Sequence, residues 1–309
     1  MAASPNSTDW FIAGMGAVGM SLAYQLHVNG MSVCLIPRSP QPNPIDLTCR
    51  SSSEDEVQWS CPTVFETTGV SIERLLVATK AFSVSDVLKK WAPSLKPNAR
   101  VYFLQNGMEF ALEEELLESV RPFVVINTGY AAFKDGENRV VQTGSAPLLV
   151  GDAMGSNDPP DMAVLEDLRM LSAADIPVQW SPDITSHRWL KMAVNAIINP
   201  LTMIFDCANG ELRTHEEAAE MIGKLVGESG ALFAAMGIPI SCDEIESSTH
   251  GTLDATARNF SSMLQDYRGG TGNHELDYIN LPLLKAGARH AVEMPTHKLV
   301  YERAIGLLR

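Results

Sequence analysis

The pattern G-x-G-x-x-G near the amino terminus constrains this fold more than any other feature of the sequence. It is formed by Gly14, Met15, Gly16, Ala17, Val18 and Gly19. An apolar run, "WFIAG", leads into it, and apolar residues then recur at a spacing near 3.6 up to Val28, before a second apolar run, "SVCLI". This order predicts a strand, a glycine turn, a helix and a second strand, which together form a βαβ unit.

Each glycine of the turn has a distinct use in such a unit. The first permits a tight turn, the second lets the backbone approach a pyrophosphate, and the third allows the helix to pack closely on the strand. The positive end of the helix would hold the phosphate. The turn therefore predicts a Rossmann-type dinucleotide-binding domain, with a merely structural glycine turn as the alternative.

Polar residues at the ends of three predicted strands indicate which dinucleotide is bound. The second strand ends at Ile36-Pro37-Arg38-Ser39 with no carboxylate nearby, whereas an NAD-specific fold usually presents an acid there. Arg38 suits a 2'-phosphate, which favours NADPH, although it could also be a solvated loop arginine. Lys80 and Asn106 end two further strands at the same sheet edge. Both are candidate site residues, although a lysine there can also be a surface residue with a buried stem.

The pattern of predicted secondary structure changes after Trp180. Strand and helix patterns alternate before it, with a hairpin signal at Asp135-Gly136, and the stretch 37–62 reads as loops and irregular edge strands. From Ser186 onward the pattern is almost wholly helical, with breaks at Asn199-Pro200, Asn209-Gly210, Gly237-Ile238-Pro239 and Met294-Pro295. We therefore expect an α/β domain over residues 1–183, with a short disordered leader at 1–9, and an all-helical domain over 184–309. A cleft between the two is the default ligand site.

Composition excludes several classes of function. With 23 Lys and Arg against 37 Asp and Glu, the net charge of -14 disfavours nucleic acid and anionic membranes as partners. The five scattered cysteines contain no C-x-x-C pair and indicate reduced thiols in a cytoplasmic protein. The seven histidines show no metal-ligand spacing, so we expect no metal.

One apolar helix carries unusual polar chemistry. In "HRWLKMAVNAIINPLT" the residues Lys191, Asn195 and Asn199 follow a spacing of i, i+4, i+8 and share one helix face. Buried amides and ammonium groups need partners, which facing polar groups or a bound polar molecule could supply. Pro200 predicts a kink or break directly after Asn199.

A second polar group follows in "NFSSMLQDYRGGTGNHELDYIN". Asn259 and Ser262 are spaced i, i+3 on a predicted helix, and Glu275 lies beyond a glycine-rich stretch. One lysine, one glutamate, several amides and a serine suit a small hydroxylated acid. In this interpretation the serine and amides hold the acid, and the lysine supplies a proton.

At this point the sequence resembles the ketopantoate reductase (2-dehydropantoate 2-reductase) family over nearly its whole length. The resemblance is carried by "GMGAVG", "QNGM", "LKMAVNAIINPLT", "NGELR", "SSMLQD" and "ELDYIN". It implies an N-terminal Rossmann domain joined to a helical domain of the 6-phosphogluconate dehydrogenase type, with NADPH and a 2-oxo acid as ligands. The chain departs from the family at Asn127-Thr128-Gly129-Tyr130, where a smaller, glycine-led turn is more usual.

The resemblance also implies residue roles. Lys191 would be the catalytic lysine, with Glu275 as its partner. The substrate-holding groups would be Asn106, Asn195, Asn199, Asn259 and Ser262. The cofactor would contact Gly14 to Gly19, Arg38, Lys80, Asn106 and Glu275.

The expected activity is the NADPH-dependent reduction of 2-dehydropantoate to (R)-pantoate, on the route to pantothenate and coenzyme A, by a monomer or homodimer. Two alternatives stay open. One is a reductase of the same fold that acts on another branched 2-oxo acid. The other is a non-catalytic NADP(H)-binding sensor, against which an intact lysine and glutamate argue.

Overall fold

The computed structural model describes residues 8–50, 56–107, 119–173, 176–270 and 274–308. Most of the predicted leader, residues 1–7, lies outside these ranges. Contacts divide the chain into two compact units. Unit 1 comprises Met1–Gln105 and Phe110–Ile184, and unit 2 comprises Asn106–Glu109 and Thr185–Arg309.

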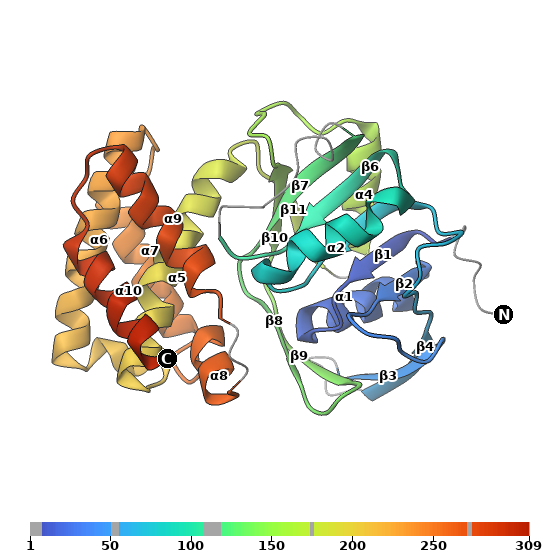
Figure 1. Cartoon of the computed structure of the whole chain (residues 1–309), viewed down its shortest axis with the longest axis horizontal. Coiled ribbons are helices and arrows are strands. Elements are labelled where there is room, and N and C mark those ends of the chain that lie inside the picture. Colours follow the sequence, from blue (N-terminus) through green and yellow to red (C-terminus); the bar gives the residue numbers. More distant parts are fainter. Residues whose placement is uncertain (1–7, 51–55, 108–118, 174–175, 271–273, 309) are drawn as a thin grey trace. The chain divides into compact units, whose positions relative to one another are not determined.

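Unit 1 is an α/β domain with two sheets (Figure 1). Its elements in chain order are β1 (Trp10–Ala13), α1 (Ala17–Val28), β2 (Val33–Ile36), β3 (Ile45–Arg50), β4 (Glu56–Cys61), β5 (Ile72–Val77), the 3-10 helix η2 (Ala81–Ser83), α2 (Val84–Trp91), η3 (Ala92–Ser94), β6 (Leu95–Phe103), β7 (Val120–Asn127), β8 (Tyr130–Lys134), β9 (Arg139–Ser145), β10 (Leu148–Asp152), α4 (Met162–Ala173) and β11 (Val178–Trp180).

The seven-stranded sheet has the order β11-β10-β7-β6-β5-β1-β2. Strands β2, β1, β5, β6 and β7 are parallel, whereas β10 is antiparallel to β7. Alternate residues of β1 enter different cores, since Trp10 and Ile12 pack with α1 and α4, and Phe11 and Ala13 pack with α2. The sheet is thus covered by helices on both faces, which confirms the predicted Rossmann-type domain.

The smaller sheet has the order β4-β3-β9-β8 and packs over α1. Two polar side chains of α1 reach it, because Ser21 Oγ lies 2.7 Å from Tyr130 Oη and Gln25 Nε2 donates to Gln142 Oε1 at 2.7 Å. The hairpin predicted at Asp135-Gly136 is confirmed by β8 and β9. In the stretch predicted as loops and irregular edge strands, β3 and β4 form a regular antiparallel pair, with β4 at the sheet edge.

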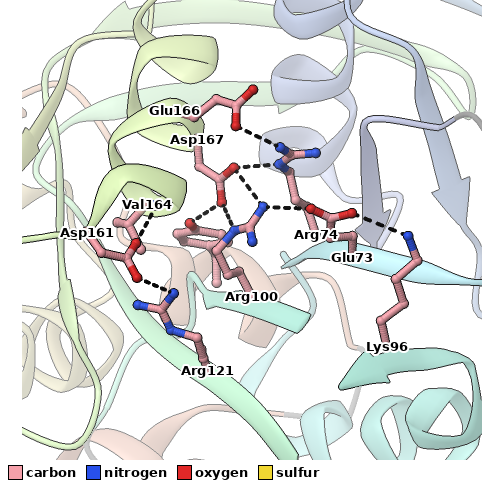
Figure 2. Close-up of polar contacts among 10 residues, drawn as sticks. Glu73, Arg74, Lys96, Arg100, Arg121, Asp161, Val164, Glu166 and Asp167 are labelled. Carbon is pink, nitrogen blue, oxygen red and sulfur yellow. Dashed lines mark hydrogen bonds and ion pairs between the residues drawn. The ribbon is translucent and has the colours of Figure 1, made fainter. Parts of the chain in front are cut away.

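A ladder of arginines crosses three strands of the large sheet. Arg74 of β5 is in register with Arg100 of β6, which is in register with Arg121 of β7. Figure 2 shows Asp167 of α4 pointing into this ladder. The buried Asp167 carboxylate accepts from Arg74 Nε at 2.5 Å, from Arg100, and from Tyr102 Oη at 2.6 Å. Like charges on adjacent strands repel, so Asp167 reduces the repulsion between Arg74 and Arg100 and fastens α4 to the sheet. Arg121, by contrast, pairs with Asp161 at 2.8 Å.

Unit 2 is all-helical, as predicted, and has a core of its own. Its elements are α5 (Ile184–Phe205), the 3-10 helix η4 (Asn209–Arg213), α6 (Glu216–Met236), α7 (Cys242–Ala255), α8 (Ser262–Arg268), α9 (Leu276–Arg289) and α10 (Pro295–Leu307). Several predicted boundaries are confirmed. Gly237 ends α6 in the left-handed conformation, and Pro295 opens α10.

The break predicted at Asn199-Pro200 is wrong, because α5 continues through Pro200 to Phe205. Proline has no N–H, so it leaves the carbonyl of Ala196, four residues earlier, without its helical donor. Asn280 of α9 supplies the replacement, since its Nδ2 donates to Ala196 O at 3.1 Å. Asn280 is fully buried, and the helix therefore continues because a tertiary contact satisfies the freed carbonyl.

Candidate active site

The glycine turn of unit 1 has the geometry that a dinucleotide requires. Gly14 has a φ of +110°, and a Cβ placed there would lie 2.9 Å from the backbone of Ala78. A Cβ on Gly19 would lie 2.2 Å from Gly14 O, whereas one on Gly16 would meet nothing within 4 Å. Gly14 and Gly19 thus shape the turn, and Gly16, at the N-cap of α1, leaves the helix terminus open to a ligand.

The predicted residues between the glycines follow the same arrangement. Met15, Ala17 and Val18 are half-buried and pack against the core beneath the turn, while Gly16 is exposed. Residues 14 to 19 therefore present backbone on the outside and apolar side chains on the inside.

Arg38 and Lys80 follow neighbouring parallel strands of unit 1. Arg38 comes two residues after β2 and is exposed, and Lys80 comes three residues after β5 and is half-buried. Because β1 lies between β2 and β5, both residues leave the sheet at the edge that carries the glycine turn. This placement suits groups that hold the phosphates of a dinucleotide.

Among the residues that the structure describes, two buried side-chain oxygens at the same edge have no hydrogen-bond partner. They are Thr79 Oγ1 and Gln105 Oε1. The amide nitrogen of Gln105 is held in place, because Nε2 donates to Val77 O at 2.8 Å and to Thr79 O at 3.1 Å. Buried polar atoms rarely remain unpaired, so these oxygens are candidate acceptors for a ligand at this edge.

In unit 2, Lys191, Asn195 and Asn199 lie on one continuous helix, α5, so their spacing places them along one face. The polar face of α5 is longer than these three residues. Arg188 precedes Lys191 by three residues and Thr202 follows Asn199 by three, so both extend the stripe. Both residues could be predicted from the sequence by extending the helical periodicity one turn before Lys191 and one turn after Asn199.

Both ends of this stripe hold other segments of unit 2. Arg188 Nη2 donates to Gly107 O at 3.0 Å, next to Asn106. Thr202 Oγ1 lies 2.7 Å from Ser261 Oγ, next to Ser262. The helix that carries Lys191 thus fixes two chain segments with predicted site residues.

Asn106 and Glu275, 169 residues apart in sequence, are brought together in unit 2. Asn106 Nδ2 donates to Glu275 Oε2 at 3.2 Å, and Glu275 is buried at the N-cap position of α9. The negative charge of Glu275 also acts on Lys191. The structure therefore brings the predicted amide into contact with the predicted glutamate, whose charge reaches the predicted lysine.

Burial controls the protonation of Lys191. Desolvation lowers the pKa of its ammonium group to about 8, and the charge of Glu275 partly opposes this change. A lysine with a pKa near 8 is still mostly protonated at neutral pH, yet it gives up its proton far more readily than an exposed lysine.

Asn259 and Ser262 are arranged differently from the prediction, which put both on one helix. Helix α8 begins at Ser262, and Asn259 lies in the connection before it. The cap is Ser261, whose Oγ accepts from Leu264 N at 3.1 Å and so prevents the helix from starting earlier. Both predicted side chains are exposed on unit 2.

Two further properties bear on the kind of site. In the part of the chain that the structure describes, no three His, Cys, Asp or Glu side chains form a group suited to a metal ion. Within the same residues, every helix is too short or too polar to span a bilayer.

Comparisons with known proteins agree with this architecture. A 2-dehydropantoate 2-reductase of Escherichia coli O157:H7 is 32% identical over 296 residues, which cover 94% of this chain and 92% of that protein. Two solved structures share the fold. One is a PanE/ApbA family ketopantoate reductase from Ralstonia eutropha JMP134, with a TM-score of 0.84 and 21% identity, covering 97% of this chain and 98% of the other. The second is D-mandelate dehydrogenase with NADH and anilino(oxo)acetate, with a TM-score of 0.85 and 22% identity, covering 97% of both chains.

Two family models account for most of the sequence. The model "Ketopantoate reductase PanE/ApbA" matches residues 10–155, and "Ketopantoate reductase PanE/ApbA C terminal" matches residues 183–307. The first covers the glycine turn and most strands of unit 1, and the second covers every helix of unit 2. The chain belongs to the ketopantoate reductase PanE/ApbA family.

Proposed function

We propose that this protein reduces 2-dehydropantoate to (R)-pantoate with NADPH, and so serves pantothenate and coenzyme A biosynthesis. The observation that carries the proposal is the grouping of Lys191, Glu275 and Asn106 beside the amides of α5. The name of the relative from Escherichia coli O157:H7 supports the same reaction.

The residues of unit 1 fit a nicotinamide dinucleotide. Gly14 and Gly19 form a turn in which a side chain would clash with the backbone, and Gly16 leaves room for a pyrophosphate. The buried oxygens Thr79 Oγ1 and Gln105 Oε1 can accept hydrogen bonds from the cofactor. The solved structure of D-mandelate dehydrogenase, which shares the fold, contains NADH. When bound, the cofactor supplies the hydride that reduces the carbonyl carbon at C2.

Lys191 supplies the proton in this proposal. Negative charge develops on the C2 oxygen as its carbon is reduced, and an ammonium group stabilises that charge before transferring a proton to it. The product hydroxyl thus takes its hydrogen from Nζ, and Lys191 then regains a proton from solvent. Glu275 favours the charged form of the lysine.

The amides of α5 orient the acid. Asn195 and Asn199 can donate to the carboxylate and hydroxyl groups of the substrate while their own oxygens accept, and they are held on a helix that does not break. Asn106, fixed by Glu275, adds another donor. Ser262, at the start of α8, and Asn259 complete the proposed substrate contacts.

NADPH is proposed over NADH because of the residues that follow β2. Arg38 is exposed at the end of this strand and can form a bidentate contact with a 2'-phosphate, and Lys80 adds a second positive charge at the same edge. The segment Pro37 to Pro40 contains no acid that would bind a ribose 2'-hydroxyl instead.

A second candidate function is the reduction of another branched 2-oxo acid. The fold shared with D-mandelate dehydrogenase favours it, because the name of that enzyme gives a different 2-hydroxy acid, D-mandelate, as its substrate. The catalytic group would be the same, and the shape of the pocket would differ.

The test is an assay of the purified protein with a panel of branched and aromatic 2-oxo acids, in which the oxidation of NADPH is monitored. We expect the highest kcat/KM with 2-dehydropantoate, and Lys191→Ala should lower turnover by about 100- to 10,000-fold while NADPH binding is retained. A higher kcat/KM with another 2-oxo acid would show that this acid, and not 2-dehydropantoate, is the substrate. Near-normal turnover by Lys191→Ala would remove the lysine from its role.

A further inference from the structure

The turn formed by Asn106 and Gly107 belongs to unit 2 by its contacts, although it follows β6 of unit 1 almost directly in the chain. Asn106 reaches Glu275 from this turn. The amide has the correct position only if the backbone of the turn is held against unit 2. The residues that hold it therefore control the geometry around Glu275.

Two contacts fix Gly107 from different helices. On α5, Arg188 Nη2 donates to Gly107 O at 3.0 Å. On α9, the backbone of Tyr278 is so close that a Cβ built on Gly107 would lie 2.3 Å from Tyr278 O. Gly107 also has a φ of +96°, which an L side chain rarely adopts. No larger residue could take this position without moving the turn.

The carbonyl of Tyr278 lacks a donor from its own helix, and the cause lies in the sequence. Pro282 lies four residues later inside α9 and has no N–H to donate, so Tyr278 O lacks its helical partner. The backbone of Gly107 packs at this freed carbonyl. Proline and glycine together create a docking point one turn of helix after Glu275.

Arg188 is held in an environment that is unfavourable for a cation. It lies one helical turn before Lys191, and burial lowers its pKa to about 10. Arg188 is half-buried, so keeping a second cation near Lys191 costs folding free energy, which its hydrogen bond to Gly107 O partly offsets.

We propose that Arg188 and Gly107 are positioning residues, which hold Asn106 against Glu275 and thereby set the surroundings of Lys191. Neither needs to touch the substrate. The inference rests on the proposed function insofar as it concerns catalysis, but the clamp itself is a property of unit 2 that can be measured without turnover.

The experiment combines kinetics with amide hydrogen exchange. Arg188→Met removes the donor, and Gly107→Ala displaces the same turn where it faces Tyr278 of α9. Each should lower kcat about 10- to 100-fold, because small misplacements of a catalytic group are costly, and KM should change less. Exchange of the amides of residues 104–107 should become at least about 10-fold faster in both variants as the turn loosens.

Coupling separates this role from general loss of structure. If Arg188 acts through Asn106, Arg188→Met should cause less than about a 2-fold further loss in an Asn106→Ala background, because contacting residues that act together are non-additive. Arg188→Lys, which keeps a donor, should recover part of the activity. His187→Gln, at the exposed neighbouring position, should behave as the wild type in both measurements.

The outcomes that would overturn the positioning role differ from those that would overturn the proposed function. Unchanged kcat and exchange in Arg188→Met, or losses that multiply fully with Asn106→Ala, would overturn the positioning role. An inactive wild-type protein whose turn still loosens in Arg188→Met and Gly107→Ala would instead reject the proposed function and keep the clamp. Should Arg188→Met fail to fold, Arg188→Lys and Gly107→Ala test the same turn.

Discussion

At the scale of single residues, two opposing effects determine the pKa of Lys191. Removal from water disfavours its charged form, and the carboxylate of Glu275 favours it, with desolvation as the larger effect. The resulting pKa of about 8 places the lysine close to the range in which a general acid works best. The pair therefore sets the pH range of the proposed reaction.

Glu275→Gln tests this balance. The variant keeps an oxygen that can accept from Asn106 but loses the negative charge, so the pKa of Lys191 should fall below its present value of about 8. A proton donor is active below its pKa, and the alkaline limb of the kcat profile should therefore move toward lower pH by about one unit. Measurement of kcat from pH 6 to 10 in both proteins checks this. An alkaline limb at the same pH would show that Glu275 does not control the lysine.

Arg38→Ala tests the choice of cofactor. Loss of a bidentate contact to a 2'-phosphate should weaken NADPH binding by about 10- to 100-fold, since hydrogen bonds to charged groups contribute about 1.5 to 3 kcal/mol. NADH lacks that phosphate, so its Kd should change little. Titration of both cofactors by fluorescence measures the difference, with the exposed Arg169→Ala as a control. Equal losses of affinity for NADPH and NADH would show that Arg38 does not contact the 2'-phosphate.

At the scale of secondary structure elements, freed or buried polar groups decide how helices are attached. Pro200 and Pro282 each leave one carbonyl without a helical donor, and another segment docks at each of them. In unit 1, α4 is attached by Asp167, which lies among Arg74 and Arg100 (Figure 2). Packing of apolar faces brings these elements together, and the polar contacts fix their register.

Asp167→Asn should destabilise unit 1 strongly. The change removes the one fully buried carboxylate among the ion pairs of the described residues, and leaves Arg74 and Arg100 adjacent in register without it. Breaking a buried ion pair costs about 3 to 5 kcal/mol, because the remaining charge stays desolvated. Urea unfolding followed by circular dichroism measures the loss. The neighbouring exposed residue provides the matched control Glu166→Gln, which should change stability by less than about 1 kcal/mol.

At the scale of the whole molecule, each unit has its own hydrophobic core. In unit 2 that core includes a histidine, since His297 of α10 is fully buried, with Nε2 2.9 Å from Ser229 Oγ. The carboxylate of Glu228 caps α10 by accepting from Thr296 N at 2.8 Å and His297 N at 3.0 Å. Burial lowers the pKa of His297 to about 4, although Glu228 opposes this shift.

Unit 2 should therefore lose stability in mild acid. The unfolded chain binds a proton at His297 below pH 6.5, whereas the folded chain does so only below about pH 4. Stability is fully present above pH 6.5 and decreases as the pH falls to about 4, by roughly 1.4 kcal/mol per pH unit and on the order of 3 kcal/mol in total. His297→Gln, which keeps a polar group near Ser229, should flatten this part of the curve. Denaturant unfolding at several pH values compares the two proteins, and equal slopes would contradict the prediction.

Much of the fold could be predicted from the sequence because its signals are local. The glycine turn, the change from alternating elements to helices after Trp180, and the stops at Gly237 and Pro295 depend on backbone freedom and side-chain periodicity. The spacing of Lys191, Asn195 and Asn199 also follows from helix geometry alone. These features need no knowledge of what packs against them.

Only the tertiary structure decided how those local signals were resolved. Pro200 continues a helix because a side chain from α9 replaces the missing donor, and Ser261 starts α8 too late to include Asn259. Asn106 meets Glu275 across 169 residues, and the pKa of Lys191 depends on the burial that folding creates. The reason is physical: satisfaction of buried polar groups and desolvation of charges depend on partners distant in the chain, which no local pattern specifies.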